Sequence, residues 1–95
     1  MTITTETLSL EEATGHVRAF HDAFGISNAS EPTGAIGDRD ALLRYKLIRE
    51  ENEEYLDAAM NGDLVEVADA LGDILYIVCG TMLKHGLEHK MGEVF

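Results

Sequence analysis

Several residue types are scarce in this 95-residue chain, and each scarcity excludes a class of protein. A single cysteine, Cys79, excludes an internal disulfide and fits the reducing cytoplasm. Lys and Arg number 7 against 18 acidic residues, a formal net charge of −11, so the chain has no basic face for nucleic acid or for an anionic membrane. The longest uncharged run, residues 74–83, is half of the roughly 20 residues that span a membrane. The N-terminus has neither the basic nor the apolar region of a signal peptide.

Proline occurs once, at position 32, and sustained strand-like alternation is absent, so we expect an all-α fold in one domain, residues 1–95. Ser9 with Glu12 forms a capping-box pattern that begins a first helix, and Gly25 ends it. Residues 25–39 hold three glycines and the proline and predict a loop. Loops of that length are usually functional or mobile.

Two longer helices follow the predicted loop. Asp38 or Asp40 is the expected cap of a second helix that runs to about residue 60, where Asn61 and Gly62 break it. Asp63 caps a third helix that ends near residue 85. Residues 87–95 resemble the first turns of a fourth helix that is short or incomplete. The sequence therefore predicts a four-helix type architecture.

Small size predicts self-association. A domain of this length buries only about 60–65% of the surface that its unfolded chain exposes, so its own core is marginal. The third helix is also apolar around most of its circumference, which leaves a surface for a partner. We expect a homodimer or homotetramer whose interface involves the second and third helices.

The placement of the acidic residues is the strongest functional signal. Nine of the 18 fall between residues 50 and 73. At 100° per residue, Glu51 and Glu54 project from the apolar face of the second helix, whereas Glu53 and Asp57 lie on a solvated face. Asp73 is the only charge between residues 71 and 83 of the third helix. An antiparallel turn between the two helices would bring Glu51 and Glu54 towards Asp69 and Asp73.

Carboxylates that face a core are costly unless they are paired or bind a metal ion. A bound divalent cation removes both the desolvation cost and the mutual repulsion. Oxygen ligands without histidine or cysteine suit Mg²⁺, with Mn²⁺ as a substitute. Arg44 lies two turns before Glu51 on the same face, where it can pair with that carboxylate or reach a substrate phosphate.

The motif E-E-x-x-E at Glu50, Glu51 and Glu54, followed by Asp73 before Ile-Leu-Tyr, resembles the MazG-like all-α nucleoside triphosphate pyrophosphohydrolases. That superfamily includes dimeric dUTPases and phosphoribosyl-ATP pyrophosphohydrolases, and the resemblance covers about residues 15–95. Two departures stand out. The commonest family pattern has a glutamate where this chain has Ala70, so we expect Asp69 to stand in for it. Small members also continue into a basic C-terminal segment, whereas this sequence stops at residue 95.

The resemblance implies Mg²⁺-dependent cleavage of the α–β phosphoanhydride of a (d)NTP, giving a monophosphate and pyrophosphate. Hydrolysis of dUTP or of phosphoribosyl-ATP by the same chemistry is the alternative within the superfamily. The implied roles are shared among nine residues. The metal ligands are Glu51, Glu54, Asp73, Asp69 and Glu50, with Glu50 and Glu51 also catalytic; the substrate contacts are Arg44, Lys84, Lys90 and Tyr76.

A non-enzymatic interpretation stays open beside this one. The same acids could form salt bridges with Arg44 or Lys84 at an oligomer interface, in a metal-binding helical oligomerisation module. Tyr76 and Cys79 could be packing residues, and Glu66 a cap. The four histidines lack a ligand-like grouping and are interpreted as structural or exposed. Base contacts are not identifiable, although the predicted loop and the aromatic residues of the first helix, Phe20 and Phe24, are candidates.

Overall fold

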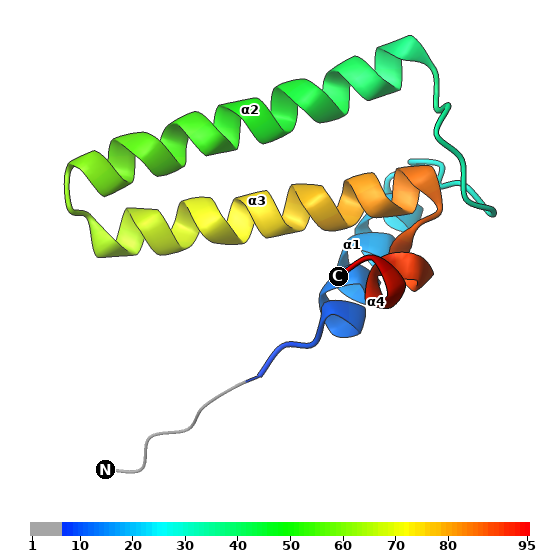
Figure 1. The fold of residues 1–95 in the computed structure, drawn as a ribbon, viewed down its shortest axis with the longest axis horizontal. Helices are drawn as coiled ribbons and strands as arrows, with labels where there is room; N and C mark the ends of the chain where they lie inside the picture. Colours follow the sequence, from blue (N-terminus) through cyan, green and yellow to red (C-terminus); the bar gives the residue numbers. More distant parts are fainter. Residues whose placement is uncertain (1–6) are drawn as a thin grey trace.

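The computed structural model describes residues 7–95, and this part of the chain is helical throughout, without strands (Figure 1). The helices are α1 (Leu10–Ala23), α2 (Asp38–Met60), α3 (Leu64–His85) and α4 (Met91–Val94), with a 3₁₀ turn over Glu88–Lys90 before α4. These bounds confirm the predicted helices, including the short fourth one. Residues 1–6, where the sequence predicts no signal peptide, lie outside the described residues.

Helices α2 and α3 form a long antiparallel hairpin, and α1 packs across the C-terminal half of α3 (Figure 1). The core lies at this crossing, where Val17 of α1 meets Cys79 and Leu83 of α3, all fully buried. Cys79 is therefore a packing residue, as one interpretation of the sequence held. The turn end of the hairpin extends beyond α1 (Figure 1).

Local hydrogen bonds explain where the helices begin. Ser9 Oγ accepts from the backbone N–H of Glu12 at 3.0 Å, and the Glu12 carboxylate accepts from the N–H of Ser9 at 3.4 Å, which confirms the capping box. Asp63 caps α3 by accepting from the N–H of Glu66 at 3.1 Å.

The predicted side-chain cap of α2 is wrong. Gly37, not Asp38 or Asp40, occupies the cap position, and it makes no side-chain hydrogen bond. Its φ of +90° is open to glycine and disfavoured for other residues, so backbone geometry selects the start of this helix. Asp38 and Asp40 instead lie in the first turn, where their charges complement the positive end of the helix dipole.

The loop between α1 and α2 is tied to the C-terminus of α3. The N–H of Ala29 donates to the carbonyl of Leu83 at 3.2 Å, and the N–H of Thr33 donates to the carbonyl of His85 at 2.9 Å. Lys84 Nζ adds a bond of 2.6 Å to the carbonyl of Ser27. These contacts satisfy carbonyls that a helix end leaves without intrahelical partners, and they give the loop a defined course over α3.

The projecting end of the hairpin carries apolar side chains that the described chain does not cover. Met60, Leu64 and Val65 are 81%, 80% and 74% exposed, and Leu71 is half exposed further along α3. Within residues 7–95, no helix is both long enough and apolar enough to cross a lipid bilayer.

Gly86→Ala should destabilise the fold, because this glycine ends α3 where the loop passes closest. Its φ is +66°, and a Cβ would lie 2.5 Å from the carbonyl oxygen of Glu31. We expect a loss of about 2 kcal/mol or more in the free energy of unfolding, measured by urea denaturation. Gly34→Ala is the control, since a Cβ there meets nothing within 4 Å and should change stability by less than about 0.5 kcal/mol. Equal effects of the two substitutions would contradict this account of the loop.

Candidate functional site

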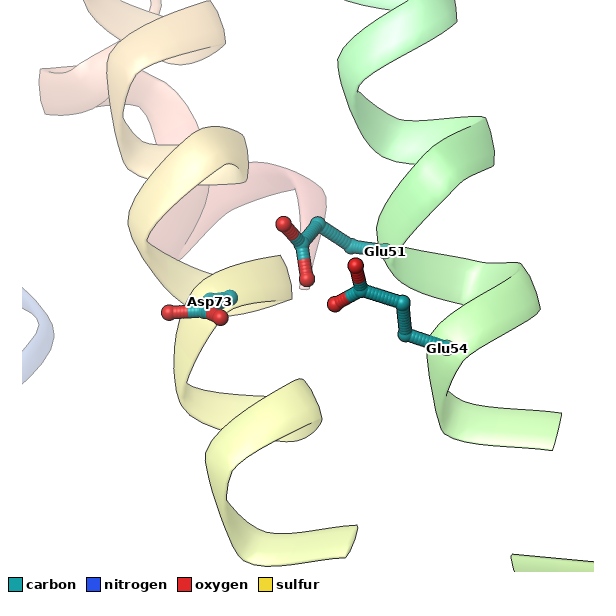
Figure 2. A group of neighbouring side chains, drawn as sticks. All are labelled: Glu51, Glu54 and Asp73. Carbon is teal, nitrogen blue, oxygen red and sulfur yellow. The ribbon is translucent and has the colours of Figure 1, made fainter. Parts of the chain in front are cut away.

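Three carboxylates meet between the two helices of the hairpin (Figure 2). Glu51 and Glu54 extend from successive turns of α2, and Asp73 faces them from α3. One oxygen from each residue lies within 4.8 Å of the others. The helical positions inferred from the sequence thus bring these three predicted ligands together.

Small side chains beside the cluster let the two helices approach. Ala58 follows Glu54 by one turn, Ala70 precedes Asp73 by three residues, and both alanines are buried. Ala70 is the position where the MazG-like pattern most often has a glutamate. In this chain that position contributes a methyl group to the packing between α2 and α3, so the third carboxylate of the cluster comes from Asp73 alone.

The cluster is electrostatically unbalanced within one chain. In residues 7–95, no Lys, Arg or His side chain forms an ion pair with any of the three carboxylates. Partial burial, followed by hydrogen bonding with Glu54 and repulsion from Glu54 and Asp73, raises the pKa of Glu51 to about 7. Glu51 Oε2 is also buried without a hydrogen-bond partner in the described chain. These are the properties of a site that lacks a positive charge.

A divalent cation fits this arrangement. Adjacent oxygens around an octahedral Mg²⁺ are about 2.9 Å apart, so side-chain rotations that draw the three carboxylates closer would let them share one ion. The orphaned oxygen of Glu51 would gain a ligand bond, and the repulsion among three negative charges would become attraction to the ion. Residues Glu51, Glu54 and Asp73 are thus the candidate ligands.

Two other predicted ligands lie outside the cluster. Asp69 lines a neighbouring groove of about 360 Å³ that it shares with Glu54, close to the turn of the hairpin. Glu50 is exposed at the edge of α2. Their roles as ligands stay predictions. Glu66 lines the same groove as Asp69, and its backbone N–H is bonded to the cap residue Asp63.

Three predicted substrate contacts line one cavity next to the cluster. This cavity of about 530 Å³ lies where α1, α2, α3 and the loop meet, and Arg44, Tyr76 and Lys84 contribute to its wall. Lys84 Nζ is bonded to Ser27 and lies 3.4 Å from the Asp40 carboxylate. Lys90, in contrast, pairs with Glu93 at 3.7 Å in the C-terminal turns and is not part of this wall.

His21 is buried in the wall of this cavity, with Nδ1 2.7 Å from Asn28 Oδ1, which confirms the structural alternative among those that the sequence allows. Its place in this wall is not predicted from the sequence. One signal was available, since His21 follows Val17 by one turn and therefore lies on the buried side of α1. Its partner Asn28 lies in the loop, and no local pattern predicts that contact.

Comparison with known proteins now assigns the family. The sequence profile described as phosphoribosyl-ATP pyrophosphohydrolase matches residues 17–93, which include every residue of the cluster and of the cavity. The chain belongs to this family. It is all-α and MazG-like, as the resemblance implied, and membership implies a hydrolase with nucleotide pyrophosphohydrolase-type chemistry.

A viral relative is similar to half of the chain, and its name gives no function. The chain is 48% identical over 50 residues to the "Uncharacterized protein L479" of Acanthamoeba polyphaga mimivirus, a match that covers 50% of this chain and 20% of that protein. The chain thus spans a small part of this relative's length. No solved structure matches the chain.

Glu51→Gln should change how stability depends on pH. A carboxyl group with a folded-state pKa near 7 binds its proton more tightly in the folded chain than in the unfolded one, where the pKa is about 4.3. Its contribution to stability is therefore fully present below about pH 4 and is lost as the pH rises through 7. The side-chain amide of the glutamine variant does not titrate in this pH range, so this contribution is absent from it.

The measurement is the melting temperature of the metal-free protein between pH 5 and 8. We expect the wild-type value to fall by several degrees more than that of Glu51→Gln over this range. Added Mg²⁺ should raise the wild-type melting temperature most at pH 8, where the site is fully ionised. Parallel curves for the two proteins would mean that Glu51 titrates normally.

Proposed function

We propose that this protein is a Mg²⁺-dependent nucleotide pyrophosphohydrolase that cleaves (d)NTPs between the α- and β-phosphates. The observation that carries the proposal is the cluster of Glu51, Glu54 and Asp73, three facing carboxylates that form no ion pair with a cationic side chain of residues 7–95. A polyanionic substrate cannot approach such a site unless a metal ion mediates. Membership of a pyrophosphohydrolase family is consistent with that requirement.

The chain's residues divide between ion and substrate in this proposal. Glu51, Glu54 and Asp73 hold the ion, and Asp69 and Glu50 are additional candidates. Bound Mg²⁺ neutralises phosphate charge and lowers the pKa of its water. The carboxylates fix the position of the phosphates, and Glu50 or Glu51 accepts a proton from the attacking water. Arg44, with part of its guanidinium buried in the adjacent cavity, is placed to contact the substrate.

Phosphoribosyl-ATP is the second candidate substrate, because the matching family profile bears its name. It would be cleaved by the same chemistry, as would dUTP. A (d)NTP and phosphoribosyl-ATP differ at the end of the nucleotide away from the reacting phosphates. A panel that contains both kinds of substrate therefore shows which one the protein cleaves.

We also propose that two or more copies associate through the projecting half of the α2–α3 hairpin. Met60, Leu64, Val65 and Leu71 expose apolar surface there, beyond the reach of α1. Such a surface is costly in water and is typical of a protein–protein contact. The interface would lie next to the metal ligands, on the same two helices.

Glu54→Gln tests the activity. We expect the wild-type protein with Mg²⁺ to release pyrophosphate from one or a few members of a panel of NTPs, dNTPs and phosphoribosyl-ATP. Loss of one ligand charge should reduce turnover by at least about 100-fold while the fold is kept. The readout is a coupled pyrophosphate assay, with circular dichroism to confirm the helical content.

Glu53→Gln is the matched control, because Glu53 lies one position away on the exposed side of α2 and pairs with Arg49 at 3.2 Å. Its turnover should stay within about twofold of wild type. If no nucleotide yields pyrophosphate from the folded protein, the oligomerisation module becomes the better account.

Leu71→Arg tests the association. Wild-type protein should elute as a dimer or tetramer of the 10.4 kDa chain in size-exclusion chromatography with light scattering. A positive charge on the exposed face of α3 should make the variant elute as a monomer at micromolar concentration. Val94→Arg, on exposed Val94 of α4, should leave the assembly unchanged. A folded wild-type monomer would refute the association.

A further inference from the structure

The side of α2 that faces away from α3 carries side chains that the described chain leaves uncovered. Among the helices of residues 7–95, only α3 packs extensively against α2, and Glu51 lies on the side of α2 that faces it (Figures 1 and 2). At 100° per residue, some side chains between residues 42 and 60 lie within about 60° of the line opposite Glu51. We call these side chains the outer stripe of α2.

The apolar members of the outer stripe stand at its two ends. Leu42 and Tyr45 lie in the N-terminal half of α2, Leu56 and Met60 lie in the C-terminal half, and each is more than half exposed. The helix rises about 27 Å between Leu42 and Met60. The side of a helix that meets only water is usually polar, so apolar residues at both ends of this stripe indicate a contact surface.

The charged members of the outer stripe fill its middle and are sorted by sign. Lys46 and Arg49 lie in the N-terminal half, and Glu53 and Asp57 lie in the C-terminal half. The stripe therefore has no net charge, although the whole chain has a formal net charge of −11. Two copies of an acidic chain repel each other over most of their surface, and this repulsion is weakest where charges of both signs balance.

This order of charges does little for a single copy of α2. Arg49 and Glu53 form an ion pair at 3.2 Å, but their side chains are 63% and 66% exposed, which makes such a pair weak. The pair also has its cation on the N-terminal side, the less favourable order for residues four apart. Asp57 lies in the last turn, which contains no basic residue, so its charge opposes the helix dipole. A second helix that runs in the opposite direction would place cations beside these carboxylates.

A two-fold axis level with position 51 makes the apolar ends of the stripe complementary to each other. In an antiparallel pair of α2 helices with that centre, Leu42 of one copy lies opposite Met60 of the second copy. Tyr45 falls within one residue of the level of the second copy's Leu56. Both ends of the pair then bury apolar side chains against apolar side chains.

The same axis pairs opposite charges in the middle of the stripe. Arg49 lies opposite Glu53 of the second copy, and Lys46 falls within one residue of the level of the second copy's Asp57. Each pair occurs twice, because the axis exchanges the two copies. A two-fold contact needs a surface that is complementary to itself, and the order of residues along this stripe has that property.

We propose that two copies of this chain associate in antiparallel orientation through the outer stripe of α2. The occupant is a second copy because the stripe complements itself in both charge and apolar character. This contact does not depend on the proposed activity. It adds a second surface to the association proposed above and shares only Met60 with the projecting half of the hairpin. Two different two-fold contacts on one chain can close a tetramer.

Charge reversal tests this contact in the Leu71→Arg background, which removes the other proposed surface. A contact between single helices is smaller than a standard interface, so we expect the background protein to self-associate with a Kd on the order of 100 μM in sedimentation equilibrium. Lys46→Glu with Arg49→Glu makes the charges of the stripe all negative, and Glu53→Lys with Asp57→Lys makes them all positive. Each double variant should stay monomeric at about 500 μM, because like charges then face each other.

An equimolar mixture of the two double variants should form a heterodimer with a Kd at least about tenfold lower than that of the background protein. Both variants keep a net negative charge, so attraction between whole chains does not account for this result. Lys90→Glu and Glu93→Lys are the matched controls, because they reverse the charges of an ion pair outside α2. Each control should self-associate as the background protein does, and circular dichroism verifies the helical content of every variant.

Cysteine cross-linking tests the antiparallel direction. Leu42→Cys and Met60→Cys are made separately in the same background, and the native Cys79 is fully buried and does not compete. Under mild oxidation, a mixture of the two variants should give disulfide-linked dimers, since a disulfide joins residues whose Cα atoms lie within about 7 Å. Either variant alone should stay mostly monomeric on a non-reducing gel.

The outcomes separate this inference from the proposed activity. A heterodimer in the mixture of charge variants, with cross-links that need both cysteine variants, would support the antiparallel contact. A monomeric mixture, or efficient cross-linking of Leu42→Cys alone, would overturn it and leave the activity standing. Since neither experiment depends on turnover, absence of pyrophosphate release would refute the activity and leave the contact standing.

Discussion

Repulsion among three carboxylates across one helical interface is the constraint on which this structure depends. Glu51, Glu54 and Asp73 face one another between α2 and α3, with Glu51 partly buried and the other two side chains exposed. Small buried residues lie beside the cluster at Ala58 and Ala70, and the pKa of Glu51 is raised first by its burial and then by the neighbouring carboxylates.

The charge of the whole chain strengthens this argument. With 18 acidic residues against 7 basic ones, the net charge of the chain opposes the approach of an anionic nucleotide. Four basic side chains, Arg18, Arg49, Lys84 and Lys90, are already in ion pairs, and Arg44 is turned into the cavity. In the proposed function, metal ions bound at the carboxylates would therefore neutralise much of the phosphate charge.

Local signals in the sequence predicted most of the fold. Ser9, Asp63 and Gly86 mark helix ends through hydrogen bonds or backbone geometry within a few residues, and helical spacing placed Glu51, Glu54 and Asp73 on facing surfaces. The misses depend on information that no short segment carries. The positive φ of Gly37 decides the start of α2, and the bond from His21 to Asn28 exists because the loop returns over the end of α3. Tertiary contacts, and not local helix propensity, determine the conformation and the partners of these residues.

The location of the site connects function with stability. The core at the crossing of α1 and α3 is small, whereas the candidate metal ligands lie on a hairpin whose outer half has little to pack against in the described chain. An ion that binds only the folded hairpin stabilises it by mass action, and a partner on its apolar side chains does the same. Binding of metal and association of subunits should therefore reinforce each other, because both act on the same two helices. An ion bound as proposed would compensate the three carboxylates and at the same time stabilise the two helices that carry them.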